Sequence, residues 1–205
     1  MILEITPPPS EANGARVRLW PRVAAYGLGL VGSATAIGAM VGAVGSIIHA
    51  LAFSSASHDQ LWLASVAVIA FVCSLHELNI IQIATPQRRW QVPAAWSNHG
   101  KSLQLLLYGL FLGADIFTLM PYATFYVLLL LEATLGMQGG AALGAVYGLV
   151  RALTALWGIG LSRHQRDTVR VATRIFRAIG LFHGANGVAL ALVGEVLLGT
   201  SLLGR

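Results

Sequence analysis

The chain has 205 residues, of which 56% are hydrophobic and 10% are charged, whereas soluble domains carry about 25% charged residues. It is therefore too apolar to cover itself with a soluble surface, and its mean hydropathy of +0.72 indicates a membrane protein. The formal net charge is +5. Because the arginines cluster beside apolar runs, the expected partner is anionic lipid of the inner leaflet and not nucleic acid. A single cysteine, Cys73, excludes an intrachain disulfide and a paired-cysteine metal or redox site.

Residues 1 to about 15 are predicted to be a flexible tail, since they are polar and contain the run Pro7-Pro8-Pro9. Residues 16–205 are predicted to form one all-α transmembrane domain with about five helices. Each apolar run reaches the roughly 20 residues that a crossing needs. The runs are Val23–Phe53, Leu61–Ile83, Ser102–Leu135, Gly139–Leu161 and Ala178–Leu203.

The cationic residues fix a predicted topology. Eleven of the thirteen precede the first run, lie between the second and third runs, or lie between the fourth and fifth runs, while the other two connections carry none. Loops rich in Lys and Arg stay on the cytoplasmic side. The sequence therefore predicts a protein of the plasma or inner membrane with a cytoplasmic N-terminus and an external C-terminus.

Small residues in the first run favour close helix packing. Gly38-x-x-x-Gly42 lets two backbones approach, because packing must replace the hydrophobic effect within lipid. The favoured interpretation is packing within the chain, and a homodimer seam is the alternative. Ala141, Gly144 and Gly148 have the same role in the fourth run.

Polar residues near the inner ends of the second and fifth runs form a candidate metal or proton site. Two histidines, a carboxylate and two amides are expected at one depth, and such groups bind metals or relay protons. The candidates are His76, Glu77, Asn79, His183 and Asn186. No metal-ligand spacing within one helix unites them, and the alternatives for Glu77 are that it reaches the surface or pairs with Arg89. Glu132 is expected near the outer end of its run, where its carboxylate meets water.

The third run has 34 residues and contains Pro121 near its middle. Proline removes a backbone donor and clashes with the preceding turn, so a kink or a break is predicted there. A broken helix would line a substrate path, with Thr118 and Tyr122 beside the break. An ordinary kinked helix is the alternative.

Asp115 and Arg151 are both expected near the midplane, on runs joined by a short link. Charges at that depth need a partner. We predict that they form an ion pair, either as a structural contact or as part of a substrate path.

Five arginines between the fourth and fifth runs recur at steps of three and four residues. This spacing predicts an amphipathic cytoplasmic helix at about 163–177 that lies on the inner leaflet. Its lipid-facing cations would be Arg163, Arg166, Arg170, Arg174 and Arg177.

From Tyr108 onward, about 100 residues resemble the transmembrane domain of CcdA and DsbD-type thiol-electron transporters, within the LysE-like transporter group. The matching features are a glycine-rich helix broken by a proline in the third run, a Tyr-Gly element in the fourth run and two glycines in the fifth run. They are Gly109–Gly113, Thr118–Pro121, Ala145–Leu149, Gly180 and Gly184. The resemblance implies a transporter scaffold. The family's two intramembrane cysteines are absent, with Met120 and Tyr122 beside Pro121, so thiol exchange is not expected.

The leading hypothesis is a small transporter or permease-like protein. The alternative is a non-catalytic subunit or assembly partner in a larger membrane complex, or a homo-oligomer. An intramembrane enzyme is less favoured, because the sequence assigns no catalytic residue and no cofactor, and nucleophile-elbow, phosphate-loop and dinucleotide motifs are absent from it.

Overall fold

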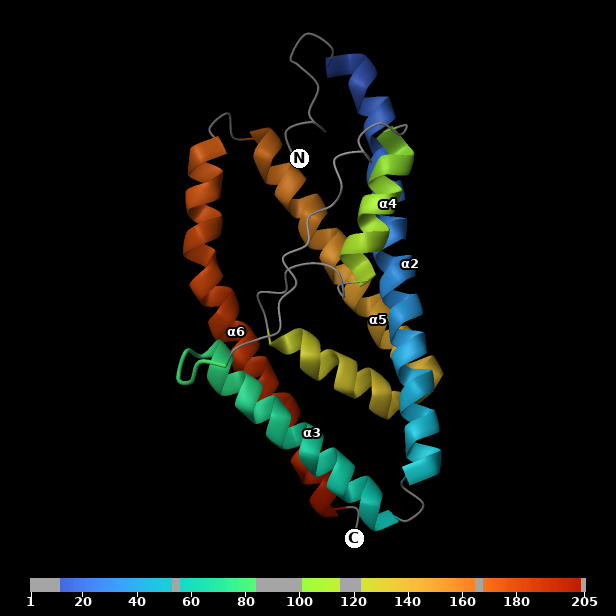
Figure 1. The fold of residues 1–205 in the computed structure, drawn as a ribbon. Coiled ribbons are helices and arrows are strands. Elements are labelled where there is room, and N and C mark those ends of the chain that lie inside the picture. The colour runs from blue at the N-terminus through green and yellow to red at the C-terminus, as the bar shows by residue number, and fades with distance from the viewer. Residues whose placement is uncertain (1–11, 53–55, 84–100, 115–122, 165–167, 204–205) are drawn as a thin grey trace. The chain divides into compact units, whose positions relative to one another are not determined.

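The computed structural model describes residues 12–52, 56–83, 101–114, 123–164 and 168–203. These ranges are helical apart from short turns and contain no strand, which confirms the all-α class (Figure 1). The helices are α2 (Ala12–Ala52), α3 (Ala56–Glu77), α4 (Lys101–Ala114), α5 (Thr124–His164) and α6 (Thr168–Leu203).

Four of these helices are long and apolar enough to cross a membrane within the described part of the chain. Their candidate spans are Pro21–Leu51, Asp59–Glu77, Thr124–Leu156 and Gly180–Leu203. Large apolar side chains on them face outward, for example Leu28 at 70% exposure and Leu181 at 78%. Surfaces of this kind need lipid contact. The chain is therefore a helical integral membrane protein, while its orientation and the count of five crossings stay predictions.

The third predicted run is divided between two helices. Its first part is α4, which ends at Ala114, and its last part begins α5 at Thr124. At 1.5 Å per residue, the 14 residues of α4 extend only about 21 Å, which is less than the roughly 30 Å hydrocarbon core. Pro121 lies outside the described residues, so the break at that proline stays a prediction.

The predicted link between the third and fourth runs coincides with an interruption in α5. Gly136 has φ 70° and ψ −178°, which is not helical. Glycine tolerates this positive φ because it has no Cβ. The interruption divides a 33-residue candidate span, which would extend about 50 Å if it were straight.

The described helices pack as two units, each of which takes segments from different parts of the sequence. The first unit contains α2 up to Ile37, all of α4, α5 from Ala142, and α6 up to Thr173. Backbones approach closely in it. An added Cβ at Gly29 would lie 2.8 Å from Leu110 N, and one at Gly148 would lie 2.8 Å from Val31 Cα.

The second unit contains α2 from Gly38, α3, α5 up to Ala141, and α6 from Arg174. The predicted motif Gly38-x-x-x-Gly42 packs within the chain against α5. An added Cβ at Gly38 would overlap the carbonyl oxygen of Gly140 and lie 2.9 Å from its carbonyl carbon. The Gly42 position faces Gly136 in the same way. Intramolecular packing thus accounts for this motif.

The region predicted as a separate amphipathic helix at about 163–177 has different helix bounds. α5 continues to His164, and α6 runs without interruption from Thr168 into the apolar stretch (Figure 1). The arginine stretch therefore shares a helix with the last run, because no proline or glycine separates them before Gly180. Arg166 lies outside the described residues, as do the side chains of Arg163, Arg170, Arg174 and Arg177. Lipid binding by these arginines stays a prediction.

Candidate functional site

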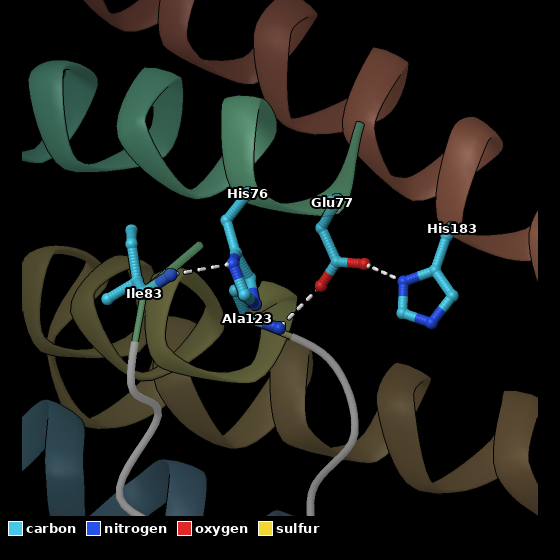
Figure 2. Close-up of polar contacts among 5 residues, drawn as sticks. All are labelled: His76, Glu77, Ile83, Ala123 and His183. Atoms are coloured by element: carbon cyan, nitrogen blue, oxygen red, sulfur yellow. Dashed lines mark hydrogen bonds and ion pairs between the residues drawn. The ribbon is translucent and has the colours of Figure 1, made fainter. Parts of the chain in front are cut away.

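Glu77 is the last residue of α3, and it is only 1% exposed. Its two carboxylate oxygens contact different segments of the second unit (Figure 2). Oε2 lies 2.6 Å from His183 Nδ1 on α6, and Oε1 accepts a hydrogen bond of 2.5 Å from the backbone N–H of Ala123. One buried carboxyl group thus joins α3, α6 and the start of α5.

The contact with Ala123 places a carboxylate at a helix N-terminus. Ala123 directly precedes α5, and the first N–H groups of a helix have no partner within that helix. A negative group is favourable there because the helix dipole leaves partial positive charge at this end. A protonated His183 would balance the same carboxylate in an ion pair.

Apolar packing and one interhelical hydrogen bond hold this arrangement. Ser74 Oγ donates to the carbonyl of Gly187 at 2.7 Å, which fixes α3 against α6. Ala123 is part of a buried cluster whose other members are Ala70, Cys73, Val127 and Leu190. The donor at Ala123 is therefore placed by core contacts as well as by Glu77.

Asn79 and His76 complete the turn that ends α3. Asn79 has φ 57°, a left-handed conformation that asparagine tolerates. Its N–H donates to His76 O at 3.0 Å, and Ile80 N–H donates to Leu75 O at 2.9 Å, which is the Schellman pattern of a helix C-terminus. His76 Nδ1 accepts a hydrogen bond of 3.1 Å from Ile83 N–H (Figure 2). The described contacts of these two residues are with the turn itself.

Of the five residues in the predicted metal or proton site, the structure brings Glu77 and His183 together. Asn186 lies on α6 and is partly buried. Among the described residues, no group of three or more His, Cys, Asp or Glu side chains could hold a metal ion. Metal binding therefore stays a prediction, whereas the Glu77–His183 pair has the chemistry to hold or transfer a proton.

Arg151 is an ionisable residue of the first unit that contacts the end of a helix. Its Nη1 donates to the carbonyl of Leu112 at 2.9 Å and contacts Tyr147 Oη at 3.2 Å, and the guanidinium carbon lies 5.6 Å from the Tyr147 ring centroid. Leu112 is in the last turn of α4, where carbonyls lack helical partners and a cation is favourable. Arg151 therefore caps the C-terminal end of α4.

The predicted Asp115–Arg151 pair cannot be compared with this geometry, because Asp115 lies outside the described residues, as do Thr118, Pro121 and Tyr122. Along the sequence, α4 ends before this segment and α5 begins after it, and each of these helix ends is capped by an ionisable side chain whose charge is opposite to the partial charge of that end. Arg151 caps the end of α4 in one unit, and Glu77 caps the start of α5 in the other. Ionisable groups in membrane spans mark functional sites by default.

Glu132 is a further buried carboxyl group, and its expected contact with water is not what the structure shows. The residue is 2% exposed, and its Oε2 has no hydrogen-bond partner among the described residues. Its spacing from Gly136 and Gly140 is four and eight residues. That spacing would have placed it on the glycine face rather than at the surface.

An apolar cavity of about 260 Å³ lies in the second unit, between α2, α3 and α5. His49 and Trp62 are its polar or aromatic members. Trp62 Nε1 donates to Thr134 Oγ1 at 3.1 Å, and His49 Nε2 lies 2.8 Å from Asp59 Oδ1. The lining residues are Met40, Val41, Val44, Gly45, Ile48, His49, Trp62 and Ala133.

Comparison with known proteins gives a partial match. No family model matches the chain, and no solved structure does. The methylamine utilization protein MauF of Paracoccus versutus is 34% identical over 145 residues, which cover 69% of this chain and 52% of that protein. The chain thus spans about half the length of the curated relative that it matches, and it is similar to a protein of methylamine utilization over most of its own length.

Proposed function

We propose that this chain is a small transporter or permease-like membrane protein, with a scaffold like that of CcdA but without thiol chemistry. The observation that carries the proposal is the buried carboxylate of Glu77, which accepts a hydrogen bond from the N-terminus of α5 and lies 2.6 Å from His183 Nδ1. Transporters commonly place their solute sites at discontinuous helices, whose free ends bind charged groups.

In this proposal, the Glu77–His183 pair is the place where a cation or a proton binds. A buried carboxylate that is held by a histidine and a backbone N–H can exchange either partner for a cationic solute or a proton. Such an exchange would release the start of α5 or release α6, because each is held through Glu77. Ligand binding would then be coupled to helix movement.

The solute class that we propose is a small alkylammonium ion, which is the protonated form of a primary amine. Its support is the similarity to a protein named for methylamine utilization. A carboxylate is the side chain that binds such a cation, and Glu77 is fully buried. The membrane orientation proposed above, with a cytoplasmic N-terminus, belongs to the same proposal.

Uptake of labelled methylammonium into proteoliposomes tests this function. We expect uptake above that of protein-free vesicles, and at least a tenfold loss in Glu77→Gln. Gly180→Ala is the matched control, because an added Cβ there would meet nothing within 4 Å. Uptake by the unaltered chain at the level of protein-free vesicles would refute the alkylammonium proposal.

A non-catalytic subunit of a larger membrane complex is the second candidate. Its support is the large apolar surface, such as Leu51 at 83% exposure, which could face other proteins as well as lipid. Mass measurement of the complex that co-purifies in mild detergent distinguishes the two candidates. A transporter is expected alone or as a homo-oligomer, and stoichiometric different chains would favour the subunit.

A further inference from the structure

Glu132 lies where α5 meets α2 in the second unit. In the described part of the chain, it shares no hydrogen bond with Glu77 or His183. It is 2% exposed, and its Oε2 has no hydrogen-bond partner among the described residues. The carboxyl group is directed at the α2 backbone. A Cβ added at Gly38 would lie 3.0 Å from Glu132 Oε1.

An ionised carboxylate is unstable in these surroundings. A buried charge without a partner is strongly destabilising, and a group in this position usually becomes neutral instead. Within a bilayer the cost persists, because no water replaces the missing partner. A proton is the smallest species that neutralises the group, and it needs no additional volume.

Cations from neighbouring helices do not neutralise Glu132 in the described part of the unit. His49 of α2 pairs with Asp59 of α3, and His183 of α6 pairs with Glu77. His76, another titratable residue of α3, accepts a hydrogen bond from the backbone N–H of Ile83.

Among the side chains that the structure describes, two further titratable groups remain on the helices that pack around this part of α5. Cys73 of α3 is in the apolar core cluster, and Glu195 of α6 is exposed. Neither carries a positive charge. Gly38, Gly42 and Gly45 of α2 pack against α5 here, and the hydroxyl of the nearby Ser46 donates to the Gly42 carbonyl at 2.9 Å.

We propose that Glu132 is a proton-binding site, whose carboxyl group carries a proton while α2 and α5 are packed at Gly38 and Gly140. Loss of that proton would leave a charge between two closely packed backbones. It therefore requires water or a cation to enter, and so requires these helices to separate. This site is independent of the solute that the chain moves, and it stands even if alkylammonium transport is refuted.

Infrared spectroscopy of the full chain in lipid tests the site at neutral pH. The spectrum of the unaltered protein minus that of Glu132→Gln is expected to contain the carbonyl band of a protonated carboxylic acid. Glutamine is neutral and similar in shape, so the variant should fold. A difference spectrum with carboxylate bands instead would overturn the proposal.

Labelling with dicyclohexylcarbodiimide gives a second readout that needs no variant. This apolar reagent reacts with protonated acids. The acid oxygen bonds to the central carbon, the proton passes to a nitrogen, and the adduct rearranges to an acylurea without losing atoms. We expect the adduct on Glu132 and not on Glu77, whose oxygens are held by His183 and Ala123. If the glutamine variant does not fold, labelling decides, and an unmodified Glu132 beside a modified Glu77 would overturn the proposal.

Discussion

Replacing Gly38 with alanine should destabilise the protein by forcing two backbones apart. The new Cβ would overlap the Gly140 carbonyl oxygen and lie 2.9 Å from its carbon, whereas ordinary contacts are 3.4–4 Å. The neighbour is backbone, so it cannot rotate away. Overpacking costs roughly 1–3 kcal/mol, and we expect the upper end of that range. Alanine recovers roughly 0.8–1 kcal/mol of helix propensity, which leaves a net loss of about 2 kcal/mol in unfolding free energy.

Gly32→Ala is the matched control for this prediction. It is on the same helix, and an added Cβ there would meet nothing within 4 Å. It gains the helix propensity without the clash, so the two variants should differ by about 3 kcal/mol, which is the overpacking term alone. Thermal unfolding of the purified protein in mild detergent measures both. Equal stability of the two variants would refute the close approach of α2 and α5. Combining Gly38→Ala with Gly140→Ala should cost less than the sum, because both act on one contact.

Three smaller changes test individual features by the same measurement. Gly136→Ala should lower the unfolding free energy by about 1–2 kcal/mol, because φ 70° is strained for alanine, and an unchanged value would contradict the interruption of α5. Trp62→Phe should cost about 0.5–1.5 kcal/mol through loss of the hydrogen bond to Thr134, whereas Thr134→Val in the Phe variant should add little. Asn79→Ala should cost about 1 kcal/mol and Asn79→Gly nothing, since only the former is strained at φ 57°; a loss with glycine would indicate a side-chain role.

Features that depend on local pattern could be predicted from the sequence. The apolar runs gave the helical membrane class, and the motif at Gly38 and Gly42 gave close packing within the chain. The interruption at Gly136 falls in the predicted link, since the glycine-rich stretch after Leu135 has weak helix propensity.

Contacts between residues far apart in the sequence could not be predicted, because hydrophobic periodicity and composition do not say which helices pack against each other. The sequence placed Glu77 and His183 at similar depth but could not separate a shared site from a carboxylate that reaches the surface. The sequence also does not indicate that Glu77 accepts a hydrogen bond from the backbone N–H of Ala123, because every residue except proline has such a donor. Asn79 was grouped with them by residue type, although its described role is to cap α3.

The joining of three helices by Glu77 is the central claim, and a double-mutant cycle with His183 tests it most directly. Unfolding free energies are needed for Glu77→Ala, His183→Ala and the double variant in the same detergent. The contact of 2.6 Å between Glu77 Oε2 and His183 Nδ1 predicts that the two costs do not add, with a coupling of about 1.5–3 kcal/mol. Costs that add to within about 0.5 kcal/mol would contradict the claim.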